Sequence, residues 1–121
     1  MAEIFVFGSN LLGIHGRGAA LTAVQKHGAI LGQGIGLQGN SYAIPTKSNP
    51  RRSLDLFSIN KFVADFLSFT YWTPDNTYLV TKIGCGLAGF NPAQIAPMFR
   101  LVKQETQLSN VQLPQEFLDL L

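Results

Sequence analysis

The sequence predicts an α/β fold in three layers, with a mostly parallel mixed sheet between helices. Short apolar runs alternate along the chain with segments of helical periodicity, which is typical of this class. The 121 residues are enough for one hydrophobic core, so we expect a single domain over residues 1–121. All twelve glycines fall in two blocks, residues 8–39 and 84–89, and each block begins directly after a predicted strand.

The first half of the chain contains two predicted strands and one predicted helix. Residues 3–7 (EIFVF) form a short apolar run typical of a buried strand. Residues 18–27 have the pattern of a helix, because small residues open it, basic residues close it and a glycine follows. Residues 41–46 (SYAIPT) predict a second strand, which Pro45 should end or place at a sheet edge.

The middle of the chain predicts a long helix and a third strand. Apolar side chains recur at helical spacing through residues 57–70, which indicates a helix with one buried face. Residues 74–76 (PDN) have the chemistry of a turn. The strand predicted for residues 77–83 then leads directly into the second glycine block.

The last part of the chain predicts a disturbed helix, a short strand and a terminal helix. Asn91 is a good helix cap, and Pro92 suits the first helical position. Pro97 should kink or shorten that helix, because proline removes a backbone donor. Residues 109–113 predict a final strand, and Pro114 opens the terminal helix.

The composition limits the classes of partner. Hydrophobic residues make up 46% of the chain and charged residues only 13%, which favours a surface partly covered by a second copy in a homo-oligomer. The net charge of +2 is too small to indicate DNA. We expect no membrane contact and no signal peptide, because no apolar run approaches the ~18 residues of a membrane span. Cys85 is the single cysteine, which excludes an internal disulfide. We expect the protein to be located in the cytoplasm.

Both glycine blocks have the pattern of an anion-binding loop. The first (FGSNLLGIHGRGAALTA) runs from a strand into a helix that opens with small residues, whose free backbone N–H groups attract phosphate. The second (TKIGCGLAGFNPAQ) repeats the arrangement. Because ligands bind beyond the carboxyl ends of parallel strands, the two loops should line one pocket, and two loops suit a diphosphate. Arg17, a cation between two glycines, should contact the anion.

Other signatures fit less well. The segment GIGLQG matches a dinucleotide-binding pattern, but a strand follows it instead of a helix, and no lysine completes a P-loop. Cys85 and His15 could form a nucleophile and base pair, although Cys85 also suits a tight loop as a small filler. His15 and His27 are too few for a metal site without nearby carboxylates, and we expect neither a metal nor a cofactor.

Three segments of the chain resemble parts of a known protein family. The segment TYLVTKIGCGLAGFNPAQIAPMF is similar to the second phosphate loop of macro domains, the ADP-ribose-binding modules. The segment FVFGSNLLGIHGRGAALTAVQKHGA resembles the other half of their pocket, and SNVQLP resembles the last strand of their fold. The likeness covers residues 4–29 and 76–113 and is greatest to small macro-like proteins of bacteria and their viruses.

The resemblance implies a set of ligand contacts. Asn10 would lie near the distal ribose, the second loop would wrap the diphosphate, and Phe90 would flank a ribose. The first loop would contribute Ser9, Asn10, Gly16, Arg17, Gly18 and Ala19, and the second Gly84, Cys85, Gly86, Leu87, Ala88, Gly89 and Phe90.

The chain also departs from the family pattern. Many macro domains hold the adenine amino group with an aspartate after an early strand, and here no acid follows Phe7. The hydrolytic branch places an aspartate shortly after Gly-Cys-Gly-Leu, where this chain has Ala88. If the protein is an enzyme, water would be activated by His15, by Lys82 or by the substrate's own diphosphate.

Two functions therefore stay open from the sequence. The first is hydrolysis of an ADP-ribose derivative such as an ester, a phosphate or a protein conjugate. The second is a module that binds an ADP-ribose-like nucleotide without chemistry, which the lack of carboxylates in both loops favours. A third interpretation, a binder of another phosphate-bearing ligand such as RNA, is weaker, because few aromatic residues alternate with basic ones.

Overall fold

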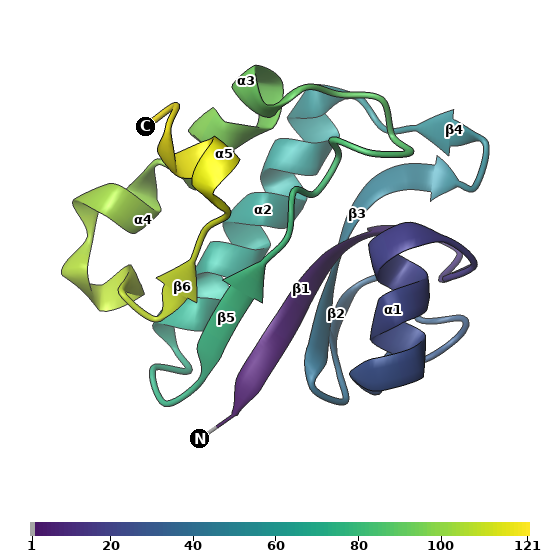
Figure 1. Ribbon diagram of the computed structural model, residues 1–121, viewed down its shortest axis with the longest axis horizontal. Coiled ribbons are helices and arrows are strands. Elements are labelled where there is room, and N and C mark those ends of the chain that lie inside the picture. The colour runs from purple at the N-terminus through teal and green to yellow at the C-terminus, as the bar shows by residue number, and fades with distance from the viewer. Residues whose placement is uncertain (1) are drawn as a thin grey trace.

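A mixed sheet of six strands forms the centre of the computed structural model, which describes residues 2–121 (Figure 1). The sheet order is β2–β3–β1–β5–β6, and β4 pairs with β3 outside this order. Neighbours among β3, β1, β5 and β6 are parallel, whereas β2 and β4 run antiparallel to β3. The strands are β1 (Glu3–Asn10), β2 (Gly36–Gln38), β3 (Ser41–Asn49), β4 (Arg52–Ser53), β5 (Thr77–Val80) and β6 (Val111–Gln112).

Helices cover both faces of this sheet, so the predicted three-layer α/β class is confirmed (Figure 1). Helix α1 (Gly18–Lys26) packs on one face, and α2 (Leu56–Tyr71) packs on the other. No helix within residues 2–121 is both long enough and apolar enough to cross a membrane. The short helices beside α2 are α3 (Pro92–Ile95), η1 (Ala96–Phe99), α4 (Leu101–Gln104), η2 (Thr106–Leu108) and α5 (Gln115–Leu118).

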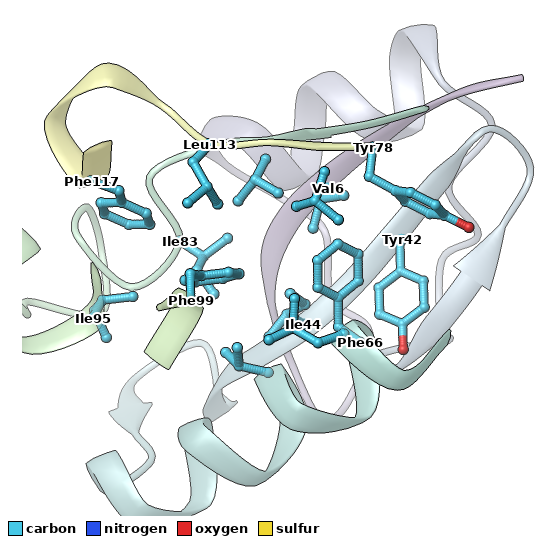
Figure 2. Packing of buried hydrophobic residues seen from close by; sticks show 14 of the residues in the cluster. Val6, Tyr42, Ile44, Phe66, Tyr78, Ile83, Ile95, Phe99, Leu113 and Phe117 are labelled. Carbon is cyan, nitrogen blue, oxygen red and sulfur yellow. The ribbon is translucent and has the colours of Figure 1, made fainter. Parts of the chain in front are cut away.

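The larger core lies between the sheet and α2. Alternate residues of β1 and β3 point to this side, among them Val6 and Ile44, which are fully buried. Phe66 of α2 projects toward them, and the Tyr42 and Tyr78 rings lie beside it at centroid distances of 5.0 and 5.5 Å (Figure 2). These edge-on aromatic contacts fix α2 across the parallel strands.

The smaller core lies between the sheet and α1. Phe7 and Ala43, the strand residues that point away from α2, pack against Ala20 and Ala23 of α1. Small alanines let the helix approach the sheet closely, and this explains the alanine-rich sequence at the start of α1. The close approach places the first turn of α1 next to the carboxyl end of β1.

Most predicted elements are present with nearby boundaries. The predicted helix 57–70 is α2, which Asp55 caps by accepting a hydrogen bond from the Ser58 backbone nitrogen at 2.7 Å. Asn91 and Gln94 form a capping box at α3, and the helix gives way to a 3-10 turn at Pro97, as the proline predicts.

Pro45 lies inside β3 and does not end it, because the strand continues to Asn49. On the side away from β1, β2 pairs only as far as Ala43 and β4 begins to pair at Lys47, so the proline lies on a locally unpaired edge, as the sequence predicts. Other details of the strands differ from the predictions. β5 ends at Val80, so Lys82 lies beyond the strand and not within it. The short strands β2 and β4 were not predicted, because two or three residues carry no periodic signal.

The sheet ends at β2 with its backbone partly covered. Gln33 lies just before the strand, and its side-chain Nε2 donates to the carbonyl oxygens of Ile35 at 3.1 Å and Leu37 at 3.0 Å. Both of these aliphatic side chains are exposed. A side-chain amide therefore takes up two carbonyls at the edge of the sheet.

Candidate functional site

A cleft of about 570 Å³ lies beyond the carboxyl ends of β1 and β5. These strands are parallel neighbours, but the chain leaves β1 toward α1 on one face and leaves β5 toward α3 on the other. Such a divergence opens a crevice in which α/β proteins commonly bind ligands. Both glycine loops line the cleft, through residues 16–20 and 83–88.

The ends of the two strands are in close contact at the floor of the cleft. A β-carbon on Gly8 would lie 3.5 Å from the Gly84 backbone nitrogen and 3.4 Å from the Thr46 hydroxyl. Gly84 itself has a φ of +76°, which only glycine adopts without strain, and lies against Ile95 and Phe90. The starts of the two glycine blocks thus meet, as their positions after two parallel strands predict.

The first loop is held in place by side chains that sequence reasoning assigned to a ligand. Asn10 Nδ2 donates to the Ile14 carbonyl oxygen at 2.8 Å, and Asn10 Oδ1 accepts from the Ile14 nitrogen at 3.1 Å. The Ser9 hydroxyl donates to the Gly34 carbonyl oxygen. Both residues line the cleft, but these bonds show that they also determine the shape of the loop.

The start of α1 presents uncapped amides to the cleft. Arg17 occupies the N-cap position with extended backbone angles, and its side chain makes no capping hydrogen bond. The backbone nitrogens of Gly18, Ala19 and Ala20 have no acceptor among residues 2–121. These three residues line the cleft, so the positive end of the helix dipole lies beside it.

The second loop closes on itself and leaves its outer amides free. The Cys85 nitrogen donates to the Lys82 carbonyl oxygen at 3.1 Å, and the Phe90 nitrogen donates to that of Gly84 at 2.9 Å. No acceptor in the described chain serves the nitrogens of residues 86–88. The Ser53 hydroxyl of β4 donates to the Ala88 carbonyl oxygen at 2.6 Å, which connects the β3–β4 hairpin to this loop.

The charged side chains around the cleft are basic. Arg17, Lys47 and Lys82 line it, and none of the described lining residues is acidic. Lys82 forms an ion pair with Glu116 of α5 at 3.1 Å, with both side chains about half exposed. The pKa of the Glu116 carboxyl is lowered by a hydrogen bond from its own backbone nitrogen and by Lys82. The ion pair holds the lysine at the rim of the cleft.

His15 does not line the cleft, although the sequence made it a candidate base. Its ring is buried in edge contact with Phe7, and Nε2 lies 2.9 Å from the Gln33 carbonyl oxygen and 3.2 Å from Gln38 Oε1. Both partners are acceptors, because Gln38 Oε1 also receives the Ile30 amide, so Nε2 carries the proton. The geometry gives His15 a structural role outside the cleft.

Cys85 lines the cleft but is not activated. Burial raises the pKa of its thiol, and the nearby Lys82 ammonium offsets only part of this increase. Because the thiolate is the nucleophilic form, a raised pKa disfavours attack at neutral pH. Cys85 therefore fits the alternative weighed from the sequence, a small residue that fills a tight loop.

Most of the predicted ligand residues border the cleft, with two exceptions. Gly89 and Phe90 lie outside its lining, and Phe90 packs against the larger core beside Gly84. Sequence reasoning did not identify Ile14, Thr46 or Lys47, which also line the cleft. The position of Thr46 near the carboxyl end of a parallel strand was the signal that could have identified it.

Comparison with known proteins found no matching family model, no similar curated protein and no similar solved structure.

Proposed function

We propose that the protein binds a diphosphate-containing nucleotide, ADP-ribose or a close relative, in the cleft between its two glycine loops, without transforming it. The observation that carries this proposal is the presence, on both sides of one cleft, of backbone N–H groups that have no acceptor within residues 2–121. A group of free amides is a binding site for one phosphate. Two facing groups suit two linked phosphates.

The charges around the cleft support an anionic ligand. Three basic side chains line it, and the nine-residue helix α1 contributes its positive end. A phosphate at this helix start would take the place of the capping side chain that Arg17 does not provide. The resemblance of both loops to those of macro domains leads to the same class of ligand.

Binding without chemistry fits the titratable groups. The Cys85 thiol has a raised pKa, and the His15 ring is buried away from the cleft. The described lining also lacks a carboxylate that could serve as a general base. A hydrolase at this site would have to depend on Lys82 or on the diphosphate of its own substrate.

Calorimetry with ADP-ribose tests the proposal. Arg17→Ala should weaken binding about tenfold or more, because a hydrogen bond to a charged group contributes about 1.5–3 kcal/mol. Gly86→Val should abolish binding, since a β-carbon there meets no protein atom within 4 Å and would occupy the ligand's space. Arg100→Ala, which removes an exposed arginine outside the cleft, is the matched control.

Two results would change the conclusion. Flat titrations with ADP-ribose, NAD and cyclic ADP-ribose would reject the nucleotide site altogether. Incubation with ADP-ribosylated protein, and separately with acetylated and phosphorylated ADP-ribose, distinguishes a module from an enzyme. Repeated turnover in any of these reactions would replace the binding module with a hydrolase.

A further inference from the structure

The cleft offers a ligand several free hydrogen-bond donors. The uncharged polar side chains of its lining already bond to the backbone: Ser9 to Gly34, Asn10 to Ile14, Thr46 to Ser9 at 3.4 Å, and Thr81 to Val6 at 2.7 Å. Backbone N–H groups remain, together with the Arg17 guanidinium and the further N–H donors of Lys47 and Lys82, each of which makes one bond within the protein. These groups are donors, and phosphate oxygens are their best acceptors.

The cleft also lacks the usual means of recognising a base. A carboxylate is the side chain that accepts most strongly from an exocyclic amino group, as on adenine or cytosine, and no residue of the described lining carries one. Stacking takes an aromatic or guanidinium plane. No aromatic residue of the described chain lines the cleft, because Phe90 packs against the core, and stacking on the Arg17 guanidinium would accept any base.

The apolar part of the lining is aliphatic. Ile14 and Leu87 reach the cleft from the two loops, with 51% and 60% of their surfaces exposed. Such side chains pack against the face of any base, since contact of this kind has no directional component. A site without directional contacts to one base discriminates weakly between bases, whereas a site built around a specific hydrogen bond rejects the wrong partner strongly.

We infer that the cleft recognises the diphosphate and its attached sugar independently of the base, so that its ligands are nucleoside diphosphosugars as a class and not adenine nucleotides alone. This inference rests on the proposed function, because it assumes that a diphosphate binds between the two loops. Affinity then comes from the amides and cations, and the base contributes only nonspecific contact with Ile14 and Leu87.

A matched ligand series tests the inference. Calorimetry would compare ADP-ribose with the hypoxanthine, guanine and cytosine forms of the same diphosphoribose, so that only the base changes. We expect the four dissociation constants to agree within about threefold. A preference above tenfold for adenine overturns the inference and leaves the proposed function intact, whereas flat titrations with all four ligands reject the proposed function itself.

Leu87→Ala provides a second readout that does not depend on the absolute affinity. The variant should weaken all four ligands by the same factor, because an aliphatic contact serves every base alike. Leu101→Ala, another half-exposed leucine outside the cleft, is the control and should change none of them. A loss at Leu87 confined to one base would show a base-selective contact and would contradict the inference.

Discussion

Alanine should have different effects at two glycines of the first loop: Gly13→Ala should lower stability, and Gly16→Ala should weaken ligand binding. At Gly13 the backbone has a φ of +71°, and a β-carbon would collide with the Gln33 nitrogen and the Gly32 carbonyl carbon and lie 2.8 Å from the Gln33 carbonyl carbon. The left-handed conformation costs about 1–2 kcal/mol for a residue other than glycine, and overpacking adds about 1–3 kcal/mol. Gly13→Ala should therefore lower the free energy of unfolding by about 2–5 kcal/mol.

Gly16→Ala is the matched variant three residues further on. Gly16 has no positive φ, and a β-carbon there meets no atom within 4 Å, so stability should stay within about 0.5 kcal/mol of the parent or rise slightly. Its methyl group would instead enter the cleft and weaken ligand binding. Urea unfolding followed by far-UV circular dichroism measures the first effect, and calorimetry measures the second. A free energy of unfolding for Gly13→Ala within about 0.5 kcal/mol of the parent's would contradict the close packing of Gly13 against Gly32 and Gln33.

Three further predictions concern single side chains. Burial, with smaller effects from Asp65 and Tyr78, raises the pKa of Tyr42 to about 12, so the folded chain resists ionisation that the unfolded chain undergoes near pH 10. The free energy of unfolding should keep this contribution below pH 10 and fall by up to about 2 kcal/mol as the pH rises to 12, allowing for partial screening by water. The same pH series on Tyr42→Phe should show no such fall. Cys85 should react with iodoacetamide at pH 7.5 more slowly than an unstructured cysteine peptide, because its pKa is raised; equal rates would contradict the burial of the thiol. Asn10→Ala should lower stability by about 1–3 kcal/mol, since the buried side chain holds both backbone groups of Ile14, and an unchanged urea midpoint would argue against that bond pair.

The sequence predicted the elements whose signals are local. The periodicity of residues 57–70, the cap at Asn91 and the helix stop at Gly28 each depend on neighbouring residues, and all three appear in the structure. The two glycine blocks predicted a shared cleft because parallel strands direct their following loops to one edge. The alternation of short apolar runs with segments of helical periodicity predicted the fold class.

What the sequence could not predict depends on contacts between distant residues. Ser9 and His15 looked available for a ligand, and only the placement of residues 30–38 beside them shows that the Ser9 hydroxyl and the His15 Nε2 are already bonded. Phe90 packs against the larger core and not into the cleft, a contact that no pattern in the sequence records. Self-association, predicted from the apolar composition, and the resemblance to macro domains stay predictions.

The glutamine amide that covers the carbonyls of Ile35 and Leu37 has a consequence for behaviour in concentrated solution. A terminal strand with vacant backbone groups can recruit a strand from another molecule and so extend into a fibre. Here the incoming chain would first have to displace Gln33 from two bonds at 3.0 and 3.1 Å. The Gln33 side chain thus protects a strand edge that carries the exposed side chains of Ile35 and Leu37, and its removal should favour fibre formation.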